Sequence, residues 1–337
     1  MAPSAPPPSG QAASAGHNDV PTVQVHALSA GHMTLPEEQF IRECTEGMRK
    51  TVPSLCFLVE HVCRKTNSVV RIVFDLGLRR DVRRYADPIQ RHIEKRQPME
   101  TDPDVVKSLK KGGLTAEDID YVIYSHVHWD HVGEPRDFTR STFIVGNGSL
   151  DLLSGNSAGL RGGHSFFEAD LLDLSRTIEL ASPGSVRPSE GFSGPRTVDT
   201  PINYSQPWKP LGGLPWTLDL FGDGSLYIVD APGHLRGHIN LLARTSSSDG
   251  GDRWVYLAGD ACHDRRILRK EKDIGEWLDA HGHVCCIHEN RAQTEATLDR
   301  IRLLEEEGVE VILAHDVEWE KEKSNEKRFF GAAPRSV

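Results

Sequence analysis

The sequence predicts a mixed α/β fold, and three observations support this prediction. Short apolar runs with the length and composition of strands recur along the 337 residues. Helix start and stop signals separate several of these runs. Many of the apolar runs end in histidine or aspartate, which puts ligand-type side chains at strand ends, where loops commonly carry function.

The first half of the chain is predicted to begin with strands. Residues 22–28 alternate weakly and can start a sheet, and "SLCFLVEHV" (54–62) and "VVRIVFDLG" (69–77) are joined by a short polar link, as in a hairpin. The stretch "TDPDVVKSLKKGG" (101–113) has an acidic, proline-containing first turn, a basic last turn and glycines beyond it, which predicts a helix. In "LTAEDIDYVIYSH", Thr115 is a cap candidate before a strand that runs into a histidine cluster.

The second half continues the alternation of strands and helices. The runs "TFIV", "SLYIVD", "INLLAR", "RWVYLA" and "VEVILA" are predicted strands. The segment "NRAQTEATLDRIRLLEEEG" puts Leu298, Ile301 and Leu304 on one face of a helix that ends at Gly308.

Composition divides the chain into a tail and one domain. Residues 1–20 form a Pro/Ala/Ser-rich segment that is predicted to be disordered, and residues 21–337 are predicted to be a single domain. Residues 182–216 contain seven prolines without periodicity, so we expect a long loop there that forms a substrate lid or, alternatively, a disordered surface insertion. The side chains that can supply an apolar lid lining are Phe192, Tyr204, Trp208 and Trp216.

Charge and composition exclude several classes of partner. The net charge of −10 argues against nucleic acid and anionic membranes, which both reward clustered lysine and arginine. No apolar run approaches the roughly 20 residues that span a bilayer. The N-terminal stretch lacks the basic and apolar regions of a secretory signal, so a cytoplasmic location and six reduced cysteines are expected. The oligomeric state is left open.

The stretch "SHVHWDHVG" (125–133) is the strongest functional signal. His126 and His128 alternate at a strand end, so both rings can face the same way, and Asp130 and His131 follow where the chain turns. Such a set suits zinc, although iron or manganese fits as well. Because these ligands exceed the three that one catalytic zinc takes, we infer a second ion that needs ligands from elsewhere.

Other strand ends offer those further ligands. "APGHLRGHINLL" contains His234 and His238, "LAGDACHD" contains Asp260, and "ILAHDVEWE" contains His315. Each of these residues alone has a simpler interpretation, such as a histidine in a structural turn or an aspartate that caps a helix. Together with the first cluster, they supply the ligands that a two-metal site requires.

In order and separation, "HVHWDH", "PGHLRGH", "AGDA" and "AHD" resemble the metallo-β-lactamase superfamily over about residues 23–320. The resemblance implies a four-layer αβ/βα sandwich with two zinc ions per chain at the edge of its two sheets. It assigns His126, His128 and His238 to the first ion, with His234 as a structural residue. It assigns Asp130, His131 and His315 to the second ion, with Asp260 bridging both. Asp75 in "FDLG" matches a position that supports a ligand imidazole, although it can equally stabilise the turn at Gly77.

The wording "IYSHVHWDHVGEP", "VGNGSLDLL" and "LAHDVEWE" resembles the N-acyl homoserine lactone lactonase-like branch, including its fungal lactonase and lactamase members. This resemblance implies that a metal-bound hydroxide opens a small cyclic lactone or a γ-lactam or cyclic carbamate, in detoxification or in degradation of quorum signals. Asp130 would carry the proton to the leaving atom. His263, at the place of a tyrosine in the best-known lactonases, would polarise the ring carbonyl.

Two alternatives belong to other classes. A glyoxalase II-like thioesterase should carry a C-terminal helical domain, and this chain extends only about twenty residues beyond His315. A metal-binding protein without hydrolytic activity should lack at least one ligand, and none is missing. The expected partner is therefore a small cyclic ester or amide.

Overall fold

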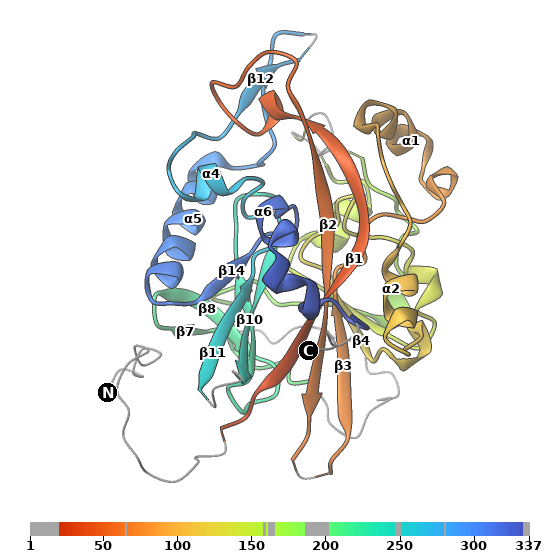
Figure 1. Ribbon diagram of the computed structural model, residues 1–337, viewed down its shortest axis with the longest axis vertical. Coiled ribbons are helices and arrows are strands. Elements are labelled where there is room, and N and C mark those ends of the chain that lie inside the picture. Colours follow the sequence, from red (N-terminus) through yellow and green to blue (C-terminus); the bar gives the residue numbers. More distant parts are fainter. Residues whose placement is uncertain are drawn as a thin grey trace.

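Two six-stranded β-sheets form the framework of the described chain (Figure 1). The computed structural model describes residues 20–64, 66–157, 160, 166–185, 202–246, 251–279 and 281–332. The tail expected at residues 1–20 therefore lies outside the described residues, except for Val20.

The first sheet has the strand order β1-β2-β3-β4-β5-β6. Its strands are β1 Val23–Pro36, β2 Arg49–Val62, β3 Val69–Phe74, β4 Tyr121–Ile123, β5 Thr142–Val145 and β6 Thr177–Glu179. The first three strands are antiparallel, and β3 to β6 are parallel. The predicted hairpin between 54–62 and 69–77 is confirmed as β2 and β3. β1 continues beyond the expected 22–28, past an irregularity between Ser29 and His32.

The second sheet has the order β14-β11-β10-β9-β8-β7. Its strands are β7 Lys209–Leu211, β8 Leu214–Asp219, β9 Leu226–Asp230, β10 Ile239–Ser246, β11 Asp252–Leu257 and β14 Glu310–Ile312. All neighbours are antiparallel except β11 and β14, which are parallel. β12 Glu276–Leu278 and β13 Val284–Cys286 form a small separate hairpin.

Helices flank both sheets. The α-helices are α1 Asp87–Ile93, α2 Val105–Lys111, α3 Ser149–Leu153, α4 Arg265–Leu268, α5 Arg291–Glu306 and α6 Val317–Lys321. Side chains of α2 and α3 share a core with the first sheet, and α4 and α5 share one with the second. A third core lies between the sheets and contains Phe57 of β2 and Ile228 of β9. The expected four-layer αβ/βα sandwich is thereby confirmed.

Side-chain alternation explains why β2 is buried on both faces. Phe57 and Val59 point into the core between the sheets, whereas Cys56 and Leu58 pack under the helices of the first sheet. A strand between two apolar layers is expected to read as a continuous apolar run, and "SLCFLV" does so.

The helix expected at 101–113 begins later, at Val105, because the Asp104 side chain accepts a hydrogen bond from the Lys107 amide at 2.9 Å and so caps it. The helix predicted to end at Gly308 is confirmed as α5. Thr115 forms a capping box with Asp118 at a short 3₁₀ turn. α1, β12 and β13 were not expected from the sequence.

The expectation of a continuous loop at 182–216 is wrong at its C-terminal end. β7 and the start of β8 lie there, and they form the edge hairpin of the second sheet. A proline in an apolar run argues against a strand, so Pro210 made β7 unexpected from the sequence. Proline is nevertheless tolerated on an edge strand, because its missing N–H faces no ladder partner. Residues 186–201 lie outside the described residues.

The remaining chain-wide expectations concern membranes and cysteines. Within the described residues, no helix has the length and apolarity needed to cross a bilayer. No disulfide joins the six cysteines, all of which the structure describes, and Cys56, Cys262 and Cys285 are buried.

Candidate metal centre

Four chain segments deliver ligand-type side chains to one place between the sheets. Each segment follows the end of a strand: β4, β9, β11 or β14. The loops are tied across the two sheets, because the Ile239 amide donates to the Ser125 carbonyl at 2.8 Å and the Leu55 amide donates to the Ala314 carbonyl at 2.9 Å. The side chains that these loops bring together, all buried, are His126, His128, Asp130, His131, His234, Asp260 and His315.

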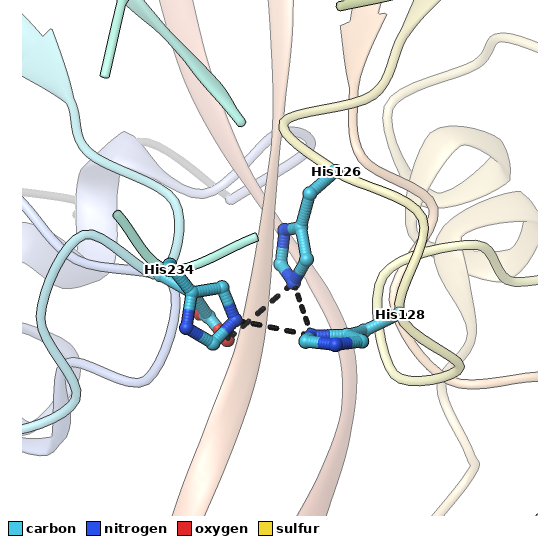
Figure 2. A group of neighbouring side chains, drawn as sticks. His126, His128 and His234 are labelled. Atoms are coloured by element: carbon cyan, nitrogen blue, oxygen red, sulfur yellow. Dashed lines mark hydrogen bonds and ion pairs between the residues drawn. The ribbon is translucent and has the colours of Figure 1, made fainter. Parts of the chain in front are cut away.

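The first ligand cluster consists of His126, His128, His234 and Asp260. Figure 2 shows the ring nitrogens of the three histidines directed toward one another. His128 Nδ1 lies 2.8 Å from His126 Nε2 and 3.0 Å from His234 Nε2. Asp260 Oδ2 lies 3.8 Å from His126 Nε2 and 3.5 Å from His234 Nε2. One ligand atom of each residue therefore faces a common point.

The second ligand cluster consists of Asp130, His131, Asp260 and His315. His131 Nε2 lies 3.2 Å from Asp260 Oδ2, and His315 Nε2 lies 3.2 Å from Asp260 Oδ1. Asp130 Oδ2 lies 3.5 Å from His315 Nε2. Because Asp260 belongs to both clusters, it has the position of the bridging ligand expected from the sequence.

The donor atoms fit metal ions. Within the described residues, His131 Nε2, His315 Nε2 and Asp260 Oδ1 are buried and have no hydrogen-bond partner. Buried polar atoms without partners are costly, and a cation between them would satisfy all three. The fit therefore rests on these atoms and on the chemistry of the donor set, three imidazoles with a carboxylate in one cluster and two of each in the other.

Electrostatics divides the histidines into two groups. Burial lowers the pKa of His126 and of His234 well below the usual value, which favours the neutral imidazole that a metal requires. Burial also opposes protonation of His131 and His315, but nearby carboxylates outweigh it and raise the pKa of both: Asp260 with Asp75 at His131, and Asp260 with Asp130 at His315. The pKa of Asp260 is well below its usual value, because His131 and His315 overcome the effect of burial.

The structure corrects the assignment of the two histidines in "PGHLRGH". His238 was the expected ligand and His234 the expected structural residue, but His234 lies in the first ligand cluster and His238 lies in neither cluster. His238 Nδ1 donates to the Ala231 carbonyl at 2.9 Å, and His238 Nε2 accepts from the Asp260 amide at 3.1 Å. Backbone groups therefore occupy both ring nitrogens. His238 directly precedes β10, which explains its structural role.

Outer hydrogen bonds orient the ligand rings. Asp75 accepts from the Ser125 amide at 2.7 Å and from His131 Nδ1 at 2.9 Å, so the supporting contact expected for Asp75 is present. His315 Nδ1 donates to the Pro53 carbonyl at 2.7 Å. These contacts fix the tautomers, so that the Nε2 atoms of His131 and His315 face the second cluster.

His263 lies beside the centre, as its sequence position predicts. Its Nε2 is 3.0 Å from Asp260 Oδ2, and its ring stacks on Phe40 at a centroid distance of 6.5 Å. His288, which was not expected from the sequence, is buried behind His234 with 3.2 Å between the two Nδ1 atoms. His288 follows β13 by two residues, and because that strand was not expected from the sequence, no strand-end signal pointed to this histidine.

The centre forms the floor of a pocket of about 880 Å³. This volume is within the usual range for small-molecule sites. The floor residues are His128, Asp130, His234, Asp260, His263 and His315. The walls come from the end of β1 and the turn after it (35–39), from α1 and the 3₁₀ turn after it (88–96), and from Arg49, Trp129, Phe166, Trp277 and Ile287.

The described parts of 182–216 do not line this pocket. Trp208 is buried in the core between the sheets, and its indole N–H donates to the Ala181 carbonyl at 2.8 Å. Tyr204 and Trp216 pack against the same core. The expectation that Trp208 lines the pocket is therefore wrong. A lid formed by 186–201, which include Phe192, stays a prediction that falls outside the described residues.

The sequence has informative relatives. Residues 50–146 match the model of the metallo-β-lactamase superfamily. The chain is 30% identical over 260 residues to the cytochrome P450 monooxygenase mpaDE of Penicillium roqueforti, covering 74% of this chain and 27% of that protein. It is 29% identical over 247 residues to the γ-lactamase FDB1 of Fusarium pseudograminearum, covering 72% of this chain and 54% of that protein. The chain thus spans about half or less of the length of these relatives.

Solved structures share this fold. An N-acyl homoserine lactone hydrolase, solved with the product N-hexanoyl-L-homoserine at its catalytic metal centre, matches with a TM-score of 0.58. The match covers 89% of this chain and 96% of that chain, at 18% sequence identity. At this identity the likeness concerns the fold.

Proposed function

This chain belongs to the metallo-β-lactamase superfamily, and we propose that it is a metal-dependent hydrolase that opens a small cyclic amide or ester. One observation carries the proposal: two clusters of buried ligands share Asp260 at the floor of a pocket of small-molecule size. Such a floor combines metal ligation with room for a substrate, as hydrolysis by a two-metal site requires.

Two zinc ions are the proposed cofactors. His126, His128 and His234 would hold the first ion, Asp130, His131 and His315 the second, and Asp260 both. When bound, a pair of such ions lowers the pKa of water toward neutrality and polarises the carbonyl that is attacked.

Asp130 is the proposed proton carrier. It is 7% exposed and lines the pocket, so its carboxylate is accessible from the substrate side. A carboxylate there can accept the proton of the attacking water and return it to the leaving atom of the opened ring. A lactam nitrogen is a poor leaving group, so a lactam needs this proton more than a lactone does.

His263 is the proposed partner of the substrate carbonyl oxygen, and the structure sets a condition on that role. Its Nε2–H is held by Asp260 at 3.0 Å, and its Nδ1 is buried without a hydrogen-bond partner among the described residues. To donate to a substrate oxygen, the Nε2–H of His263 must therefore leave Asp260 and turn to the substrate. While the His263–Asp260 hydrogen bond is present, His263 orients the bridging carboxylate.

A γ-lactam or cyclic carbamate is the first substrate class to test, and a lactone is the second. A sequence match of 29% identity over most of this chain relates it to a γ-lactamase, whereas the lactone hydrolase likeness rests on the fold alone.

The test combines metal analysis with a substrate panel. Purified protein is expected to contain about two zinc ions per chain by plasma emission and to hydrolyse at least one compound in a panel of γ-lactams, cyclic carbamates, lactones and thioesters. His128→Ala should abolish turnover and reduce metal content, and His281→Ala, an exposed histidine outside the pocket, serves as the matched control. Hydrolysis of thioesters alone, or a His128 variant with two ions and full turnover, contradicts the proposal.

A further inference from the structure

A buried arginine lines the wall of the pocket. Arg96 ends the 3₁₀ turn Glu94–Arg96, which follows α1, and this turn contacts β1. Figure 1 shows α1 beside the upper part of β1, away from the ligand-bearing strands of the second sheet. Only 8% of the Arg96 surface is exposed, and its side chain borders the same cavity as His128 and Asp130.

Arg96 is held by neutral partners. Its Nε donates to His92 Nε2 at 3.2 Å, and its Nη2 donates to Gln39 Oε1 at 2.8 Å. An arginine can only donate, so both partners act through neutral lone pairs. Within the described residues, Arg96 forms no ion pair with a carboxylate, and its Nη1 has no hydrogen-bond partner.

This arrangement has an electrostatic cost. Burial lowers the pKa of Arg96 to about 10, the positive charge of Arg49 adds to the effect, and the charge of Asp130 partly opposes it. A buried cation is normally compensated by a paired anion. Asp130 is assigned to the second ion, so its charge is shared with a stronger cation.

Other buried arginines in this protein are compensated by carboxylates. Arg79 is 1% exposed, and its two Nη atoms donate to the two carboxylate oxygens of Glu168 at 3.1 and 2.8 Å. Arg265, which is partly buried, pairs with Asp316 at 2.7 Å. These two arginines hold the fold together away from the pocket. Arg96 differs from them because no carboxylate of the described chain pairs with it and because it lines the pocket.

We propose that Arg96 is the anion subsite of this pocket and that it binds a carboxylate already present on the substrate. The planar guanidinium of an arginine matches a carboxylate in two parallel hydrogen bonds, and Arg96 lines the cavity. The substrate class is therefore a small lactam or lactone that carries a carboxylate on or beside its ring. This subsite rests on the proposed function, because both use the same pocket. The carboxylate that ring opening creates forms at the floor and is a separate group.

The kinetic experiment uses one matched pair of substrates. The pair is 5-oxotetrahydrofuran-3-carboxylate and its methyl ester, with the corresponding 5-oxopyrrolidine pair for lactam opening. Wild-type protein should prefer the carboxylate over the ester by about 10-fold or more in kcat/KM, the value expected for one charge-assisted pair. Arg96→Gln should lower kcat/KM for the carboxylate by about 10–100-fold and change that of the ester by less than about threefold.

Two further variants distinguish the effect of the paired guanidinium donors from the effect of positive charge. Arg96→Lys keeps the charge but not the paired donors, so it should restore only part of the preference. Arg253→Gln, at an exposed arginine of β11 outside the pocket, makes the same change of net charge and should leave the carboxylate-to-ester ratio within about threefold of wild type. Each variant must retain the wild-type zinc content and circular dichroism spectrum.

A binding experiment separates this proposal from the proposed function. Calorimetry on the zinc-loaded protein compares glutarate, which has two carboxylates, with monomethyl glutarate, which has one. Glutarate should bind about 10-fold or more tightly than the monoester, and Arg96→Gln should remove this difference. If no ring compound is hydrolysed but this difference depends on Arg96, the subsite stands and the hydrolase proposal fails.

The opposite outcomes overturn the subsite. Hydrolysis of both members of a pair with a ratio that Arg96→Gln leaves unchanged means that Arg96 is structural. If Arg96→Gln does not fold, the binding experiment on the wild-type protein is the test. A preference for glutarate over monomethyl glutarate below about 10-fold refutes the proposal.

Discussion

The floor and the wall of the pocket are built on different principles. The floor consists of buried side chains at four strand ends, and most of them are held by a neighbour or by the backbone, as Asp75 holds His131. The wall consists of short turns and α1, with several exposed side chains and with Arg96, whose hydrogen-bond partners among the described residues are neutral. The difference indicates that rigid strand ends carry the chemistry, whereas the wall determines which substrate reaches it.

The largest expected effect is on the bridging position of the floor. Asp260→Ala should lose both ions and lower kcat/KM on the order of 10³-fold or more, because each ion contributes several kcal/mol to the transition state. Asp130→Ala should retain more metal, because Asp130 belongs to one cluster only. Plasma emission and kinetics on the two variants measure this. If the Asp260 variant keeps both ions and the Asp130 variant keeps none, Asp260 is not the bridging ligand.

The two histidines of "PGHLRGH" offer the next contrast. His234→Ala should lower the occupancy of the first ion and abolish turnover, whereas His238→Ala should keep two ions at saturating zinc. His238→Ala should instead lower the free energy of unfolding by about 1–3 kcal/mol, since it leaves the Ala231 carbonyl and the Asp260 amide unpaired. Metal content and denaturant unfolding of both variants decide between them. The correction fails if the His238 variant loses an ion and the His234 variant does not.

His288 tests how far the floor extends outward. It contacts His234 at 3.2 Å on the side opposite the first cluster, so His288→Ala should weaken zinc affinity by about 10–100-fold without changing the number of ions at saturation. A competition titration with a zinc chelator measures this affinity, with His281→Ala as the control. An unchanged affinity in the His288 variant would limit the role of His288 to packing.

The smallest effect on turnover is expected at Trp208. Trp208→Ala should lower the free energy of unfolding by about 3–5 kcal/mol, because the indole is buried between the sheets, and KM should stay within about twofold of wild type. Denaturant unfolding and kinetics measure the two quantities. A raised KM with an unchanged free energy of unfolding would mean that Trp208 lines the pocket and that the wall includes part of 182–216.

Local patterns of the sequence determined much of the floor and of the fold. His126, His128, Asp130 and His131 lie within six positions, so the spacing of the strand and turn decides how they face one another. The same holds for α5, whose apolar period and terminal Gly308 are properties of one segment. The β2–β3 hairpin was predictable because a short link leaves two apolar runs few other partners.

The tertiary structure decided what depends on distant partners. His234 and His238 have similar local surroundings in the sequence. They differ because the second sheet places the Ala231 carbonyl and the Asp260 amide at the ring nitrogens of His238. Trp208 belongs to the core and not to the pocket because the edge hairpin of β7 and β8 docks there. Arg96 reads in sequence as one more charge in "EKRQP", and its burial beside Gln39, 57 positions away, became visible only in the fold. Burial and hydrogen-bond saturation belong to contacts between distant segments, which local periodicity does not encode.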